Sequence, residues 1–296
     1  MTETISLSES EHVERGRSQW RTNLGIFLKP KTSKAGLVML IVIVGIVLIG
    51  PLVVHQSPYN YSSAINRPPT LAHPFGTDYL GRDIFAQVTL GSYNTLPIAI
   101  LAALGSVALG TLVGVFAGYF ERLNAGLSAT SEIILALPAL PLLILLLSLY
   151  GASMFLMTLV LTLVLWPPIT RAIRPQVTSL KKLPYVDAAK IAGLSDLRVV
   201  FRVVLPGIAP ISVAYFVLNI ATSVIIVTAL EFLGLGNVDV VSWGSVLYWA
   251  QQFAFNYGDW WWVLAPGLII SLFAISFALM GFAVEEVLNP RLRSRR

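Results

Sequence analysis

The sequence has no cysteine among its 296 residues. Disulfide bonds, thiolate chemistry and cysteine-ligated metal sites are therefore excluded. Charged residues are also scarce, at 12% of the chain, whereas an average soluble domain carries about 25%. Hydrophobic residues reach 56%, and the mean hydropathy is +0.76. This composition predicts an all-α protein that crosses a membrane several times.

The groups that most enzymes need are missing as well. The three histidines, His12, His55 and His73, are scattered and have no zinc-type spacing. No pair of catalytic carboxylates and no nucleophile with a plausible base can be identified. The chain also lacks the glycine-rich phosphate loop that ends in Gly-Lys-Ser or Gly-Lys-Thr. We therefore expect no catalytic residue, no metal site and no cofactor, and no binding of ATP by this chain itself.

The N-terminal segment, residues 1–34, is polar, first acidic and then basic. Trp20, Leu24 and Phe27 follow a helical spacing with basic residues nearby, which suggests a helix lying on the membrane surface. A loosely ordered tail is the alternative. No small-residue cleavage site follows the first apolar run, so a removed signal peptide is not expected.

Six transmembrane helices are predicted from the apolar runs. The charge-free run 133–170 has 38 residues and would form a helix about 57 Å long, against a hydrocarbon core of about 30 Å. It must therefore hold two spans, with the natural turn at Gly151–Ser153. The predicted spans are 35–54, one within 84–120, two within 133–170, 203–230 and 260–284.

The basic residues fix the expected orientation. An even number of spans places both termini on one side, together with the turn near Arg122 and the segment 171–206. That side carries 18 of the 20 Lys and Arg residues. The positive-inside rule makes it cytoplasmic. We thus expect 1–34 and the basic tail 289–296 in the cytoplasm, 55–91 outside, and a core at 92–288 that holds the second to sixth spans.

A mixed-charge segment lies between the predicted fourth and fifth spans, at 174–206. Pro184 can open a helix and Gly193 can end it in a left-handed conformation. Ser195 can then cap a second helix with Asp196 in its first turn, and Pro206 is expected to stop that helix. The sequence predicts a cytoplasmic helix-turn-helix.

This segment resembles the loop that defines the permeases of ATP-binding-cassette importers. The family pattern is Glu-Ala-Ala, a glycine and Ile-x-Leu-Pro. Here the matching residues, with Asp in place of Glu and Val in place of Ile, are Asp187, Ala188, Ala189, Gly193, Leu205 and Pro206. In the family this loop is the coupling helix that docks into the ATPase subunit. The resemblance therefore implies that these six residues couple the chain to an ATPase.

A second motif narrows the resemblance. Residues 73–83, His-Pro-Phe-Gly-Thr-Asp-Tyr-Leu-Gly-Arg-Asp, are similar to a signature of the dipeptide, oligopeptide and nickel permeases, in the subunit with the shorter outer segment. Gly76 and Gly81 permit tight turns, and Thr77 or Asp78 could cap the following helix. We expect a structural brace over the second span; direct contact with substrate is the alternative.

Further matches follow in the family's order. They are Trp166 with Arg171 and Arg174, Leu230–Gly236, Ser242–Gly244, Trp261 and Trp262 with Pro266 and Gly267, and Asn289–Arg291. The sequence departs from the family at Glu231, where a serine is usual, and at Gly281-Phe282, where the family has Gly-Asp. The resemblance covers residues 35 to 293.

The resemblance implies half of a translocation path in a prokaryotic cell membrane. The implied partners are a second similar permease, two ATPase subunits that use ATP, an external solute-binding protein and membrane lipid, with no nucleic acid. Short peptides are the first substrate that it implies, and nickel or oligosaccharides are alternatives. A proton-coupled secondary transporter is the alternative from another class.

Two acidic residues lie within the predicted spans. Glu132 falls in the third span and Glu231 at the outer end of the fifth. A carboxylate inside a membrane is costly to desolvate, so each is a candidate for the translocation path or a gate. The alternative for Glu132 is a structural pairing with an arginine or the backbone near the cytoplasmic face.

Overall fold

The computed structural model describes residues 31–53, 57–151 and 153–288. The regular elements of the described part are all helices, and it contains no strand apart from a single bridge between Thr77 and Asp83. The long helices are α2 (Lys31–Val53), α3 (Ile84–Tyr119), α4 (Glu121–Ala136), α5 (Ala139–Tyr150), α6 (Met154–Leu165), α7 (Pro167–Leu180), α10 (Leu205–Phe232), α11 (Trp243–Tyr257) and α12 (Trp260–Leu288). Between α7 and α10 lie α8 (Pro184–Ile191), α9 (Asp196–Val199) and the π-helical turn η1 (Val200–Val204).

Helix α3 is the centre of the arrangement. It packs against α7, α10, α6, α2 and α4, while α12 lies between α10 and α2. A core of apolar side chains fills the space around α3, α6, α10, α11 and α12, and a second cluster joins the last turns of α3 to α7, α8, α9 and η1. The prediction of an all-helical protein is confirmed.

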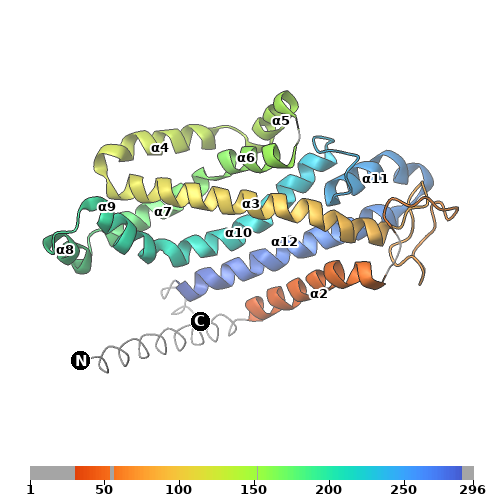
Figure 1. The fold of residues 1–296 in the computed structure, drawn as a ribbon, viewed down its shortest axis with the longest axis horizontal. Coiled ribbons are helices and arrows are strands. Elements are labelled where there is room, and N and C mark those ends of the chain that lie inside the picture. The colour runs from red at the N-terminus through yellow and green to blue at the C-terminus, as the bar shows by residue number, and fades with distance from the viewer. Residues whose placement is uncertain (1–30, 54–56, 152, 289–296) are drawn as a thin grey trace, which may run out of the picture.

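The two ends of the molecule carry different elements (Figure 1). Helices α8 and α9 form one end, and the start of α2 and the end of α12 face the same way. The segment 57–83 and helix α11 form the opposite end. This arrangement agrees with a topology in which the helix-turn-helix lies on the side of the termini. The predicted surface helix within 1–34 falls mostly, and the tail 289–296 entirely, outside the described residues.

Three helical segments of the described part are long and apolar enough to cross a membrane: Ile84–Tyr119, Asp196–Phe232 and Trp260–Val284. The number rises to five if two bent pairs, α4 with α5 and α6 with α7, each count as one span. The predicted six spans are therefore not confirmed. The first predicted span, 35–54, does form a helix, α2, that packs along α12.

The prediction of two spans within 133–170 did not include the bends between α4 and α5 and between α6 and α7. The turn at Gly151 is confirmed, with φ of 89° between α5 and α6. However, the helices reach beyond the charge-free run, and α5 turns by 86° from α4 at the break Leu137-Pro138. The second pair bends by 43° at Trp166. Proline cannot donate a helical hydrogen bond, so breaks are favoured before Pro138 and Pro167.

Three glycines bring α3 and α7 into close contact. Gly110, Gly114 and Gly118 recur every four residues, so they share one face of α3. A Cβ atom on Gly114 would lie 2.8 Å from Cβ of Ile173, and one on Gly110 would lie 2.6 Å from the carbonyl oxygen of Trp166. Small residues at this spacing let two membrane helices approach closely. The hydroxyl of Thr170 uses this proximity to donate to the carbonyl of Gly110, at 2.8 Å.

We predict that Gly114→Val lowers the free energy of unfolding by about 1–3 kcal/mol, because the added side chain overpacks the contact with α7. Thermal unfolding of the purified protein in detergent, followed by tryptophan fluorescence, measures the change. Gly126→Ala is the matched control, since a Cβ at Gly126 meets nothing within 4 Å. A helical Gly→Ala change is otherwise favourable by about 0.8–1.0 kcal/mol. Equal melting temperatures for Gly114→Val and the wild type would contradict the packing argument.

Candidate functional site

Three parts of the molecule hold the residues that the sequence singled out. The segment from α8 to η1 occupies one end and the motif 73–83 occupies the other (Figure 1), and Glu231 lies in the last turn of α10.

Gly193 ends helix α8 as predicted, with φ of 85°. The amide of Gly193 donates to the carbonyl of Lys190, and the amide of Leu194 donates to the carbonyl of Ala189. These two bonds form a Schellman motif, which satisfies the last carbonyls of a helix and favours glycine at the left-handed position. A Cβ there would meet no atom within 4 Å. The left-handed backbone conformation, and not a lack of space, therefore favours glycine at position 193, because a side chain there would meet no steric obstacle from other residues.

The second helix begins at Ser195, but not through the predicted cap. Ser195 occupies the N-cap position without a side-chain hydrogen bond. Asp196 is tied instead to helix α3, because the hydroxyl of Tyr119 donates to its carboxylate at 2.7 Å. The ammonium group of Lys190, at the end of α8, lies 5.2 Å from the centre of the same tyrosine ring. Tyr119 thus contacts both helices of the segment.

The prediction that Pro206 stops the second helix was wrong. Helices α9, η1 and α10 continue into one another, and Asp196–Phe232 forms one helical run of 37 residues. The π-helical turn explains how this is possible. The amide of Leu205 donates to the carbonyl of Val200, five residues back. This wider turn changes the register ahead of Pro206, which has no amide hydrogen to donate and whose ring would crowd an ordinary α-helical turn.

The six coupling candidates divide by exposure. Asp187, Ala188, Gly193 and Pro206 are exposed, whereas Ala189 and Leu205 are partly buried against the second core cluster. Apolar side chains surround the exposed group at the tip of the segment. Those that are at least 40% exposed are Leu183, Tyr185, Ile191 and Leu197, and Ile191 reaches 87%.

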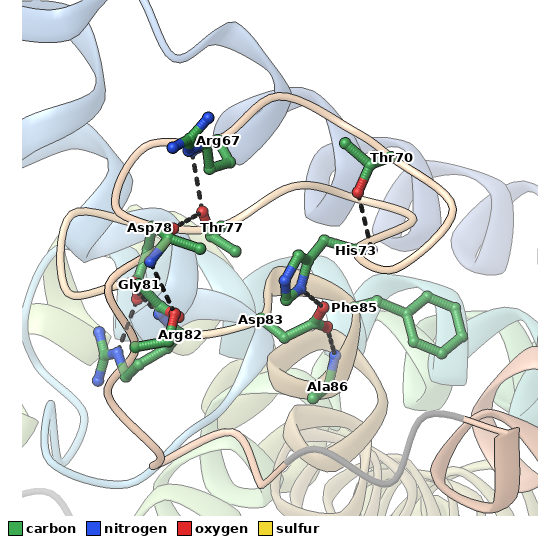
Figure 2. A network of polar contacts seen from close by, with 12 residues as sticks. Arg67, Thr70, His73, Thr77, Asp78, Gly81, Arg82, Asp83, Phe85 and Ala86 are labelled. Atoms are coloured by element: carbon green, nitrogen blue, oxygen red, sulfur yellow. Dashed lines mark hydrogen bonds and ion pairs between the residues drawn. The ribbon is translucent and has the colours of Figure 1, made fainter.

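The motif 73–83 folds around a buried carboxylate, that of Asp78 (Figure 2). The amides of Leu80 and Arg82 donate to its Oδ1 atom at 2.9 and 2.8 Å. Its Oδ2 atom accepts from the guanidinium Nε of Arg82 at 2.7 Å and from Nε2 of Gln87, on α3, at 2.9 Å. A buried charge needs such partners to offset its loss of solvation.

Asp83, and neither Thr77 nor Asp78, caps helix α3. Its Oδ1 atom accepts from the amide of Ala86 at 2.7 Å, and its Oδ2 atom lies 2.8 Å from Nδ1 of His73 (Figure 2). The prediction that Thr77 or Asp78 caps the helix was therefore wrong. Thr77 instead accepts from the backbone amide of Arg67, at 2.9 Å, and so closes the loop on itself.

The glycines of this motif make the turns that the sequence predicted. Gly76 and Gly81 have φ of 77° and 72°. A Cβ on Gly76 would also lie 2.6 Å from the ring of Trp261, at the start of α12. Tyr79 stacks on Phe253 of α11, with ring centres 4.0 Å apart. The motif therefore joins the segment 57–83 to α3, α11 and α12, as a structural brace would.

Glu231 is buried, 5% exposed, where α10 meets α3 and α11. Its Oε2 atom accepts from the amide of Gly244 at 3.2 Å and from the hydroxyl of Thr95 at 3.4 Å. Gly244 is the second residue of α11, where a carboxylate interacts favourably with the helix dipole. A Cβ on Gly244 would lie 2.3 Å from Cβ of Glu231. The glycine therefore allows this contact to form.

Glu132 has quite different surroundings. It is exposed on α4, and no hydrogen bond or ion pair to it is found among the described residues. The predicted pairing with an arginine is thus not seen within this chain. The nearby arginine, Arg174, instead contacts Asn124 and Ser128 on α4. Glu132 and Glu231 are not brought together, so they form no shared site.

Several residues of these sites were missed in the sequence. Tyr119 and Gln87 lie inside an apolar run, and nothing local marks their partners. Thr95 is 136 residues away from Glu231. The glycine repeat at 110, 114 and 118 is a readable signal, because its four-residue spacing indicates a close helix contact.

Comparison with known families matches most of the chain. Residues 106–294 match the model of the binding-protein-dependent transport system inner membrane component. Residues 18–72 match that of the N-terminal transmembrane domain of oligopeptide transport permease C.

Two relatives match nearly the whole length. The chain is 31% identical over 296 residues to a putative peptide transport system permease protein of Brucella suis, covering 99% of each protein. It is 32% identical over 282 residues to the dipeptide transport system permease protein DppC of Alkalihalophilus pseudofirmus, covering 94% of this chain and 91% of that protein.

A solved structure shares the fold. The inward-facing MetNI methionine ATP-binding-cassette transporter contains a chain with a TM-score of 0.53 and 21% identity. The match covers 68% of this chain and 96% of that one. It shows a shared helical architecture.

We predict that Asp78→Ala destabilises the segment 57–83, because it leaves the guanidinium of Arg82 without its buried partner. Breaking a buried pair costs about 3–5 kcal/mol. Limited proteolysis within 57–83 should accelerate, and the melting temperature should fall. Arg67→Ala is the control, since Arg67 is exposed and only its backbone amide donates to Thr77. Unchanged proteolysis of Asp78→Ala would contradict the brace.

Proposed function

The chain belongs to the binding-protein-dependent transport inner membrane components, and is thus a permease subunit of an ATP-binding-cassette importer; we propose that it passes short peptides across the cell membrane. Permeases of this family work with a second permease, ATPase subunits and a substrate-binding protein. The peptide assignment is supported by relatives named for peptide and dipeptide transport at 31% and 32% identity.

We place one half of the translocation path in this chain and the other half in a second, similar permease. One helix-turn-helix per chain would engage one ATPase, so two permeases would serve two ATPases. ATP would bind to those subunits alone. Oligosaccharides or nickel are alternative cargoes, since the external binding protein selects the substrate. Neither cargo appears in the names of the two relatives described above.

The docking surface for the ATPase, in this proposal, is the exposed tip of α8. Ala188 and Asp187 are exposed there, and the apolar side chains of Ile191 and Tyr185 flank them. Exposed apolar side chains gathered on a projecting element are typical of a protein interface. Small residues such as Ala188 permit the helix to press into a groove. Ala189 would not contact the ATPase directly in this proposal, because it packs against the chain's own core.

Tyr119 would carry motion from this surface into the membrane. It is the last residue of α3, and it contacts Asp196 and Lys190 of the docking segment. The continuous helix from Asp196 to Phe232 gives a second rigid connection. A push on α8 would therefore reach both α3 and α10. The opposite ends of these two helices meet at Thr95 and Glu231.

Glu231 is proposed as a gate residue because it joins α10, α3 and α11 at the outer end. Its contact with Gly244 must break if α11 separates from α10. Glu132 is exposed on α4 and is proposed to face either the path or the second permease. A proton-coupled transporter that used these two carboxylates would need them to exchange protons in turn, and they share no contact within the described chain.

The proposed orientation places α8 in the cytoplasm and 57–83 outside. Because the chain has no cysteine, single cysteines can be introduced without background. We predict that Leu71→Cys is labelled in intact cells by a membrane-impermeant maleimide, since Leu71 is fully exposed. Ser195→Cys should be labelled only after permeabilisation. The reverse pattern would overturn the orientation.

We predict that Ala188→Trp abolishes coupling while the chain still inserts. The complex of permeases, ATPases and binding protein would be reconstituted in liposomes with a mixture of short peptides. Stimulation of ATP hydrolysis by the peptide-loaded binding protein should fall at least about tenfold, the result of losing about 1.4 kcal/mol of docking. ATPase retention on the purified permeases should fall with it.

Ala188→Ser is the matched control, because serine is small enough to preserve the exposed surface. It should keep wild-type hydrolysis and uptake. Full ATPase retention in Ala188→Trp would show that this surface does not dock the ATPase. Uptake that follows a proton gradient without ATP would contradict the importer mechanism itself.

A further inference from the structure

A buried carboxylate at the start of α12 has no role in the functions considered so far. Asp259 is 2% exposed, and its Oδ2 atom has no hydrogen-bond partner among the described residues. Two hydrogen bonds hold its backbone: its amide donates to the carbonyl of Ala254 at 3.0 Å, and its carbonyl accepts from the amide of Trp262 at 3.0 Å. Leaving a buried charged group unpaired is costly. The carboxylate therefore has no cationic partner among the described residues.

A cavity of about 350 Å³ lies beside this carboxylate. It is lined by Ala254, Gly258, Asp259, Trp260, Val263 and Leu264. Asp259 is the only ionisable residue in this lining, and the remaining surface is largely apolar. Such a cavity suits a ligand that has one cationic group and an apolar body.

An apolar stripe continues from the cavity along α12. Trp260, Leu264 and Leu268 are separated by four residues, so they lie on one face of the helix. Their exposed fractions are 62%, 48% and 50%. Leu272, at 38%, extends the same stripe. Because α12 is a candidate membrane span, this face offers a hydrocarbon chain a path from the interface toward the bilayer centre.

We propose that Asp259 binds the ammonium headgroup of phosphatidylethanolamine, with an acyl chain of the lipid along Leu264 and Leu268. A primary ammonium in the cavity can supply the missing positive charge to this carboxylate and donate hydrogen bonds to it. The indole of Trp260 suits the headgroup level, where tryptophan is enriched in membrane proteins. The lipid would thereby fix the start of α12 beside the brace formed by residues 73–83.

Burial alone raises the pKa of Asp259 above its ordinary value. An ammonium group in the cavity would oppose this effect, since a nearby positive charge favours the ionised form. The headgroup of phosphatidylcholine is less suitable, because its trimethylammonium has no hydrogen to donate. Phosphatidylglycerol has no cation at all. Selectivity among these three lipids therefore tests the proposed chemistry.

The test uses the assembled importer purified in detergent and incubated with equal amounts of the three lipids. Native mass spectrometry would count the lipids that the complex retains. We expect preferential retention of phosphatidylethanolamine, reduced about tenfold by Asp259→Asn through loss of the ion pair. Asp239→Asn should have no effect, because Asp239 is exposed. Leu264→Phe, which narrows the cavity and keeps the carboxylate, should also reduce retention.

Equal retention of the three lipids, or full retention of phosphatidylethanolamine in Asp259→Asn, would overturn the proposal. Glycerophosphoethanolamine, which lacks acyl chains, should not compete at equal concentration; effective competition would assign the site to a soluble amine. If Asp259→Asn instead lowered the yield of the complex equally in every lipid, the carboxylate would pair with a basic residue of another subunit. Each of these outcomes leaves the importer assignment itself unaffected.

Discussion

The close approach of α3 to α7 is the contact on which much of this structure depends. Inside a bilayer the hydrophobic effect does not drive one helix toward another, so packing and hydrogen bonds must hold them together. Glycine at 110, 114 and 118 lets the backbone of α7 approach, and Thr170 then reaches the carbonyl of Gly110. With α7 in place, the second core cluster can form around Tyr119, and the segment α8–η1 has a base on which to pack.

The end of the molecule that holds the motif 73–83 is organised by a different physical constraint, the cost of burying charge. Asp78, Asp83 and Glu231 are each buried, and each accepts a hydrogen bond from at least one backbone amide. Two of these amides, those of Ala86 and Gly244, belong to the first turns of α3 and α11. Carboxylates therefore fix the positions at which these helices begin. Asp259 is the exception among the buried carboxylates of the described residues, and the proposed lipid site rests on its unpaired oxygen.

Helix α3 connects these two regions. One of its ends holds Asp83 and Gln87 in the polar network of the motif 73–83, and the other holds Tyr119 between α8 and α9. The helical run 196–232 lies beside it and also reaches from one end to the other. Two long helices that share contacts at both ends provide a physical route by which docking at one end could affect the other. The π-helical turn before Pro206 is what keeps the second of these helices continuous.

The sequence by itself determined the local features. The lack of charge predicted an all-helical membrane protein, Gly151 and Gly193 marked turns that need a positive φ, and the two family motifs identified the permease family. These features depend on neighbours in the sequence or on backbone conformation, so a linear pattern can record them. The wrong prediction at Pro206 shows the limit, because a wider helical turn upstream removed the conflict that normally ends a helix.

Only the tertiary structure decided which residues meet. The sequence shows only that Glu231 is an acidic residue within a predicted span. Its contacts with Thr95 and Gly244 depend on how α3 and α11 pack against α10. Likewise, Ala188 and Ala189 look equivalent in the sequence, yet one is exposed and the other packs against the core. Partners that are more than a hundred residues apart leave no local pattern. Their proximity follows from helix packing, which involves the whole chain at once.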